Sequence, residues 1–148
     1  MNRTLLALVL LFGCSQPDSF GGMTLSSPAF ANNEHIPKQY TCDGANISPP
    51  LVIGGVPSSA KSLTLVVTDP DAPGGTFTHW KAINIGPNLT MITEGGHPGQ
   101  EQANGFGKVG YGGPCPPSGE HHYVFTLTAL DGNGKSVAQA KLTGTYKR

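Results

Sequence analysis

The segment Tyr123-Val-Phe-Thr-Leu-Thr-Ala-Leu130, followed at once by Asp131-Gly-Asn-Gly134, decides the fold class of this 148-residue chain. Its alternating aromatic, aliphatic and β-branched side chains are typical of a β-strand. The Asp-Gly-Asn-Gly sequence supplies residues that accept a positive φ at little steric cost, as tight hairpin turns require. From Ala138 to Lys147, small or apolar side chains alternate with polar ones. The sequence therefore predicts a β-hairpin with one buried face.

Four further segments extend this pattern toward the N-terminus. Ser62–Thr68 and His79–Ile85 read as strands, whereas the Pro-punctuated segments Thr24–Ala31 and Ile47–Ile53 read as edge strands, because Pro cannot donate to a ladder. Between Gly95 and Gly119 the chain is rich in Gly and Pro, which indicates a long loop. With 21 Gly, 13 Pro and no long helical period, the chain is predicted to be all-β.

Composition excludes several classes of function. Nine basic residues balance nine acidic ones, and neither sign forms a run, so the sequence predicts no nucleic-acid partner. No apolar stretch reaches the roughly 18 residues that a spanning helix needs. Neither a nucleophile elbow nor a phosphate loop nor a His-Glu-x-x-His motif is present. The sequence therefore predicts no cofactor and no resident metal.

The N-terminus predicts export from the cytoplasm. A positive start and the apolar run Leu5–Phe12 are typical of a signal peptide over residues 1–13. Leu11-Phe-Gly-Cys14 resembles a bacterial lipobox, so residues 14–22 are interpreted as a lipidated Cys14 and a tether, and residues 23–148 as the domain. A lipoprotein of the cell envelope, periplasmic or on the outer surface, is the preferred location. Plain secretion and an uncleaved signal are the alternatives.

Two cysteines remain in the domain. Cys42 and Cys115 form an even pair in a compartment that permits disulfides, so they are either bridged or two partly buried thiols. A catalytic thiol is less favoured, because Cys115 lies between prolines and not at a helix N-terminus that would lower its pKa.

Five side chains that carry chemistry lie at predicted strand ends. Asp69 and Asp71 follow the predicted strand Ser62–Thr68, and His79 opens the next strand. His121 and Tyr123 are two residues apart and share one face of the strand that precedes the hairpin turn. Gathered at one edge, they would form an anion pocket with neutral donors and imidazoles, closed by a Gly-Gly-Pro-Cys-Pro-Pro loop. The alternatives are an Asx turn at the aspartates and edge residues satisfied by loop backbone. His122 points to the opposite face and is left out of this site.

Four motifs together resemble the phosphatidylethanolamine-binding proteins, specifically their bacterial Raf-kinase-inhibitor-like branch. They are Asp69-Pro-Asp-Ala-Pro73, His79-Trp80, Gly110-Tyr-Gly-Gly-Pro-Cys-Pro-Pro117 and His121-His-Tyr-Val-Phe125, and the resemblance runs from Met23 to the C-terminus. It implies an antiparallel two-sheet β-sandwich with Greek-key connections, little helix and a small preformed pocket for phosphate-like groups. The ligand-binding residues that it implies are Asp69, Asp71, Pro73, His79, Gly113, Pro114, His121 and Tyr123.

The chain departs from this family at two places. His122 stands where relatives usually have Arg, which puts any role of that Arg in packing or partner contact in doubt. Only Gly132–Val137 connects the last two predicted strands, where relatives commonly insert a helical segment. A more open site or a different oligomeric state is the expected consequence.

The leading hypothesis is a binding protein of the cell envelope that holds a phosphate-bearing anion such as a phospholipid head group, with a membrane anchor at Cys14. It is not expected to be an enzyme. The alternative is an interaction or inhibitor protein that acts on a partner enzyme through its loops, and a homodimer is also open. A hydrolase or metal-dependent enzyme that uses His79, His121 and the two aspartates ranks third.

Overall fold

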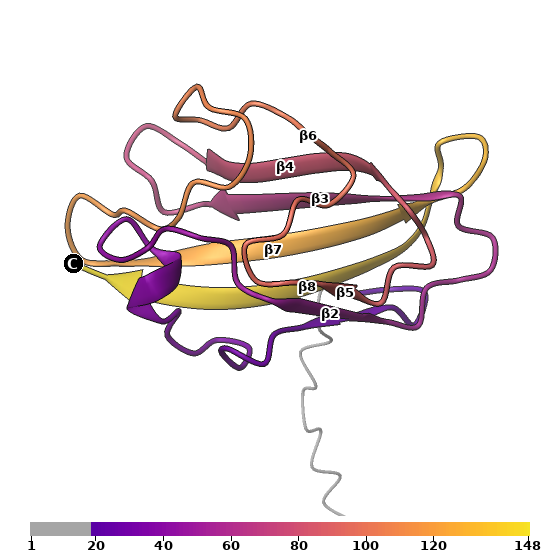
Figure 1. Cartoon of the computed structure of the whole chain (residues 1–148), viewed down its shortest axis with the longest axis horizontal. Coiled ribbons are helices and arrows are strands. Elements are labelled where there is room, and N and C mark those ends of the chain that lie inside the picture. Colours follow the sequence, from indigo (N-terminus) through magenta and orange to yellow (C-terminus); the bar gives the residue numbers. More distant parts are fainter. Residues whose placement is uncertain (1–18) are drawn as a thin grey trace, which may run out of the picture.

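The computed structural model describes residues 19–148, which form two antiparallel β-sheets and one short 3-10 helix (Figure 1). This confirms the predicted all-β class. The elements in chain order are β1 (Thr24–Ser26), η1 (Lys38–Tyr40), β2 (Leu51–Gly54), β3 (Ser62–Asp69), β4 (Phe77–Ile85), β5 (Met91–Ile92), β6 (Gln100–Glu101), β7 (Glu120–Leu130) and β8 (Ser136–Lys147).

The larger sheet has the strand order β6-β4-β3-β7-β8. Its longest pairing is the predicted hairpin, in which β7 and β8 stay in register from the Glu120–Lys147 pair to the Ala129–Ala138 pair and shift by one residue at the Leu130–Ser136 pair. In the turn, the Asp131 carboxylate accepts the backbone N–H groups of Asn133 and Lys135, each at 2.9 Å. The hairpin is thus closed by local hydrogen bonds, as the Asp-Gly-Asn-Gly sequence predicts.

The smaller sheet has the order β1-β2-β5 and is less regular than predicted. β1 ends at Ser26, because Ser27 turns its hydroxyl to the carbonyl oxygen of Pro50 at 2.6 Å. The two-residue strands β5 and β6 lie in segments without a strand pattern of their own. Each forms by pairing with a longer neighbour, β2 for β5 and β4 for β6.

The core fills the space between the sheets. Inward side chains of β3 and β7, among them Leu65, Phe125 and Leu127, are completely buried. Burying a side chain of this size stabilises the fold by about 1.5–3 kcal/mol. The strict alternation of these strands therefore fixes which face of the larger sheet is inside.

Residues that precede the predicted domain start at residue 23 already contact the larger sheet. Phe20 forms a two-way backbone pairing with Gln139 at 2.9 and 3.0 Å, and the Ser19 hydroxyl accepts the N–H of Lys141 at 3.3 Å. The last residues of the segment 14–22 therefore lie along β8. Cys14 and the predicted signal peptide lie outside the described residues, and no helix within residues 19–148 is long and apolar enough to cross a membrane.

Antiparallel pairing brings several strand ends together. The end of β3, the starts of β4 and β7 and the end of β8 meet at the edge where Figure 1 marks the C-terminus, opposite the Asp-Gly-Asn-Gly turn. Every strand end that the sequence analysis singled out lies at this edge.

Candidate functional site

A β-bulge in β4 turns His79 toward the inside. Val67 pairs with Trp80 and the next residue, Thr68, pairs with Thr78, so His79 is skipped in the ladder. Both His79 and Trp80 are consequently buried, although neighbouring residues of a regular strand point to opposite faces. The bulge gives the site an imidazole without taking the tryptophan out of the core.

β7 presents His121 and Tyr123 on its inner face, where the strand period places them. His121 is 7% exposed and Tyr123 is fully buried. Further along the same face, Phe125 continues into the core. His121 therefore lies where the core reaches the sheet edge.

The carboxylate of Asp69 positions the His121 ring. Nδ1 of His121 lies 2.7 Å from Oδ2 of Asp69, and both side chains are buried. The other oxygen of Asp69 accepts the backbone N–H of Asp71 at 2.8 Å. Asp69 thus closes an Asx turn with one oxygen and orients the His121 imidazole with the other. The turn and the site, which the sequence analysis treated as alternatives, are both present. Nε2 is the ring nitrogen of His121 that remains for a ligand.

His79 is held in a comparable way by backbone. Its Nδ1 lies 2.7 Å from the carbonyl oxygen of Gly112 and donates to it, so Nε2 is the ring nitrogen that remains for a ligand, with the Gly113 backbone also near the ring. Burial lowers the pKa of His79, and the Gly112 carbonyl and the Asp69 charge oppose this shift. The neutral ring therefore presents a hydrogen-bond acceptor at Nε2, and the protonated ring presents a donor.

A pocket of about 190 Å³ opens beside these rings. Its polar lining consists of Asp69, His79 and His121. The rest of the lining comprises Ala72, Pro73, Phe77 and Phe106, together with Cys115, Pro116 and Pro117 from the loop that was predicted to close the pocket. Phe77 could have been found from the sequence, since it lies two residues before His79 on the same strand. No sequence signal identifies Phe106.

Tyr123 lies behind the pocket. Its ring contacts that of His79 edge to face, with a centroid distance of 5.2 Å. Its buried hydroxyl makes no hydrogen bond of ordinary geometry to any described residue, although the Cys115 backbone lies near it. Burial raises the pKa of Tyr123. The hydroxyl is therefore a donor in want of an acceptor, which is rare for a buried group.

Asp71 does not line the pocket. Its Oδ2 accepts the backbone N–H of His122 at 2.8 Å and lies 2.6 Å from Nδ1 of the same residue. These hydrogen bonds lower the pKa of Asp71. The sequence analysis placed Asp71 in the site and left His122 out, whereas the structure joins the two on the outer face of β7. There they fasten the β3–β4 loop to the start of β7.

Gly113 and Pro114, also predicted as pocket wall, lie outside the lining and anchor the loop that carries it. The N–H of Gly113 donates to the Asn46 side chain at 2.8 Å, and the carbonyl of Pro114 accepts the N–H of Cys42 at 3.1 Å. A Cβ at Gly113 would lie 2.4 Å from the Tyr40 carbonyl, so only glycine fits there.

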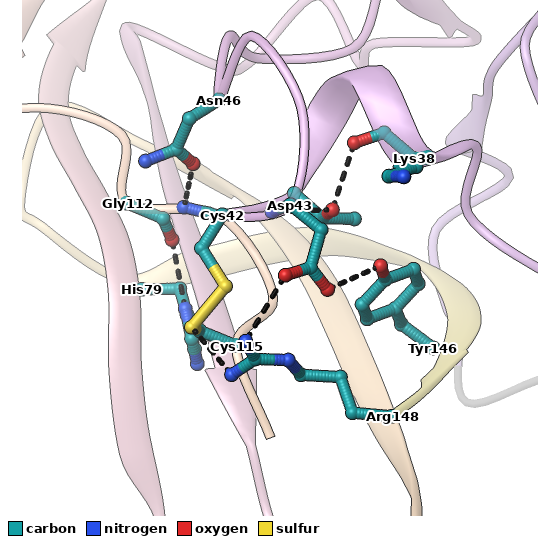
Figure 2. Close-up of a disulfide and its surroundings, with 11 residues drawn as sticks. Lys38, Cys42, Asp43, Asn46, His79, Gly112, Cys115, Tyr146 and Arg148 are labelled. Atoms are coloured by element: carbon teal, nitrogen blue, oxygen red, sulfur yellow. Dashed lines mark hydrogen bonds and ion pairs between the residues drawn. A yellow bond between two sulfur atoms is a disulfide. The ribbon is translucent and has the colours of Figure 1, made fainter. Parts of the chain in front are cut away.

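The structure contains the Cys42–Cys115 disulfide, which lies beside His79 and Gly112 (Figure 2). The C-terminus covers this bridge, because Arg148 pairs with Asp43 at 3.1 Å and approaches the sulfur of Cys115 at 3.5 Å. Cys115 thus forms a structural disulfide and is also part of the pocket wall. Among residues 19–148, no three His, Cys, Asp or Glu side chains gather as metal ligands would.

The chain is similar in sequence and in fold to known proteins. The family model of the phosphatidylethanolamine-binding proteins matches residues 26–147. A crystal structure from Chlamydia trachomatis, described as a homolog of these proteins (CT736), is 38% identical and superposes with a TM-score of 0.82, covering 87% of this chain and 99% of that one. Escherichia coli YbcL, described as a member of the mammalian family, is 29% identical with a TM-score of 0.79, covering 86% and 99%.

The chain is also similar to curated proteins that carry the label UPF0098. The Pyrococcus horikoshii protein PH1269 is 51% identical over 71% of this chain, and the Archaeoglobus fulgidus protein is 44% identical over 86%. The chain spans about half the length of these two relatives, 58% and 47%. It spans 99% of the Methanothermobacter thermautotrophicus relative, which is 45% identical over 85% of this chain.

Proposed function

Because this chain belongs to the phosphatidylethanolamine-binding protein family, we propose that its pocket binds a small phosphate-bearing anion. The observation that carries the proposal is the pair of imidazoles at the pocket. Each has Nδ1 occupied by a buried acceptor, Asp69 or the Gly112 carbonyl, and each keeps Nε2 available.

The protonation states follow from these hydrogen bonds. A neutral imidazole whose Nδ1 donates elsewhere can only accept at Nε2, so it can bind a phosphate that still carries a proton. A fully ionised phosphate needs at least one protonated ring, whose Nε2–H then donates. The anion and the proton therefore bind together, and the buried carboxylate of Asp69 stays hydrogen-bonded to His121 throughout.

Calorimetric titration of the purified chain with inorganic phosphate and with phosphoethanolamine tests this function. We expect saturable binding that His121→Ala weakens at least about tenfold, since one charge-assisted hydrogen bond is lost. His122→Ala is the matched control, because it removes the neighbouring imidazole on the outer face. Absence of binding by the folded parent, or equal losses in both variants, would contradict the proposal.

The proposal assigns binding and not catalysis. Within the pocket lining no hydroxyl or thiol is available as an activated nucleophile, since Cys115 is bridged and the imidazoles have no such partner there. Release of nitrophenol from p-nitrophenyl phosphate, lost in His121→Ala and retained in His122→Ala, would overturn this part of the proposal.

We further propose that the protein works in the cell envelope, anchored by a lipid on Cys14. The lipobox-like Leu11-Phe-Gly-Cys14 supports the anchor, and the disulfide favours an oxidising compartment. Metabolic labelling with a fatty acid and fractionation of cells test it. We expect label in the membrane fraction for the parent and none for Cys14→Ser. An unlabelled parent in the soluble cytoplasmic fraction would refute the location.

A further inference from the structure

The pocket separates its polar side chains from its apolar ones. The polar groups are Asp69, His79 and His121, which belong to β3, β4 and β7. The remaining wall is apolar: Phe77 comes from the start of β4, and the loops supply Phe106, Ala72, three prolines and Cys115 of the disulfide. None of these side chains offers a hydrogen bond to a ligand beyond the anionic group.

Phe106 is the exposed end of this apolar wall. It is 49% exposed, yet its ring packs edge to face against Phe77 and His79, with centroid distances of 4.8 and 5.6 Å. A Cβ on Gly112 would lie 2.6 Å from this ring, so the ring packs directly against the glycine backbone. The ring therefore lies in contact with the same imidazole that faces the anion.

The Asn104 side chain and backbone hydrogen bonds together hold the hairpin that carries Phe106. Oδ1 of Asn104 accepts the N–H groups of Phe106 and Lys108 at 2.9 and 3.3 Å, and its Nδ2 donates to the carbonyl of Gly110 at 2.9 Å. Asn104 itself is buried. A half-exposed phenylalanine at a preorganised position is typical of a recognition surface, because little side-chain entropy is lost when a ligand covers it.

From this arrangement we propose that the pocket selects small organic anions that carry an aromatic ring next to the anionic group. The inference rests on the proposed function, since the anion binds at the imidazoles. A cavity of about 150 Å³ accepts benzene, and this pocket of about 190 Å³ is open to solvent beside Phe106, so a ring next to the bound anion can extend toward Phe106. The ring of the ligand packs against Phe106 in the geometry that aromatic pairs prefer.

A polar substituent fits this wall poorly. A glycerol or sugar hydroxyl would exchange its water hydrogen bonds for contact with prolines and phenylalanines, which is unfavourable. An alkyl chain would bury apolar area but would not gain the edge-to-face contact with Phe106 and Phe77. The order of affinity expected at equal anionic charge is therefore aryl, then alkyl, then hydroxylated substituents.

Two matched ligand pairs test the proposal by calorimetry: phenyl phosphate with methyl phosphate, and benzoate with acetate. The parent should bind the aryl member of each pair at least about tenfold more tightly. Phe106→Ala should reduce the ratio to about twofold or less while the affinity for methyl phosphate stays within about twofold. Val109→Ala, on the same hairpin and 72% exposed, is the matched control and should keep the ratio.

The outcomes separate this inference from the function on which it rests. A parent that binds all four ligands without preference, or a ratio unchanged in Phe106→Ala, refutes the aromatic selectivity and leaves anion binding intact. A folded parent that binds none of them refutes both. Tighter binding of hexyl phosphate than of phenyl phosphate would overturn the proposal in favour of an alkyl amphiphile. If Phe106→Ala proves insoluble, Phe106→Leu replaces it and should still lower the ratio.

Discussion

Two aspartate–histidine pairs fasten the end of β3 to the start of β7, one on each face of the larger sheet. The His121–Asp69 pair is 2.7 Å long, with side chains 9% and 5% exposed, and the His122–Asp71 pair is 2.6 Å long, with side chains 53% and 41% exposed. Their geometry is nearly the same, so burial distinguishes them. Breaking a buried pair destabilises by about 3–5 kcal/mol, whereas an exposed pair contributes about 0–1 kcal/mol. Only the buried His121–Asp69 pair can therefore organise a binding site.

Removing the disulfide, whose Cys115 lines the pocket beside the buried pair, should have the largest effect on stability. The bridge joins residues 73 apart in sequence. Its loss in Cys42→Ser/Cys115→Ser should lower the free energy of unfolding by about 4 kcal/mol through the entropy of the unfolded chain. Urea denaturation measures this, with Cys14→Ser in both proteins to prevent exchange. A loss below about 1 kcal/mol would show that the loop is held without the bridge.

Matched substitutions of the two aspartates test the comparison directly. Asp69→Asn should lower the free energy of unfolding at pH 7 by about 2–3 kcal/mol, since a buried charge-assisted hydrogen bond becomes neutral. Asp71→Asn should change it by less than about 0.5 kcal/mol, as is usual for surface sites. Denaturant titration of both variants measures the difference. Equal losses would mean that the exposed His122–Asp71 pair stabilises the fold as much as the buried His121–Asp69 pair does.

Anion binding should depend on pH through the inner side alone. Sulfate keeps its charge between pH 5 and 8, so its binding requires a protonated imidazole. Burial lowers the pKa of His79, so this ring is neutral at pH 7 and gains a donor only as the pH falls. The dissociation constant of sulfate should therefore increase by up to about tenfold per pH unit as the pH rises. His122→Ala should show the same slope by calorimetry, and a flat profile in the parent would contradict proton-coupled binding.

The outer pair should have the smallest effect, confined to acid. The pKa of Asp71 is lowered by its hydrogen bonds from His122, so its contribution is present above about pH 4 and is lost as the pH falls through the lowered value. Because the pair is exposed, the loss should stay below about 1 kcal/mol. His122→Ala should therefore lose less stability than the parent between pH 4 and 2. A steeper acid loss in the variant would reverse the assignment.

The inner pair was partly predictable from sequence. The period of two in β7 places His121 and Tyr123 on the core face, and an aspartate that ends a buried strand lies at the same edge. The position of His79 follows a different rule, because a bulge shifts the strand by one residue and depends on how β4 pairs with β3. The sequence could propose His79 for the site, but pairing alone explains how it and Trp80 both face inward.

Asp71 shows why the rest could not be predicted. Alternation stops where β3 ends, and the turn closed by Asp69 redirects the chain, so the next carboxylate meets His122 on the outer face. The lining residue Phe106 comes from a hairpin whose position depends on contacts across the fold. His122 is far from Asp71 in sequence, and Phe106 is far from His79. No strand period relates the members of either pair.

The long strands β3, β4, β7 and β8, the hairpin turn and the inner face of β7 follow from sequence alone, because they depend on alternation and on local turn chemistry. Long-range packing sets the short strands, the side chains that line the pocket, the aspartate that faces it and the place where the disulfide closes its wall. The physical reason is that strand pleating acts between neighbouring residues, whereas a pocket is formed by loops whose positions are set by packing, by β-bulges and by hydrogen bonds between distant segments.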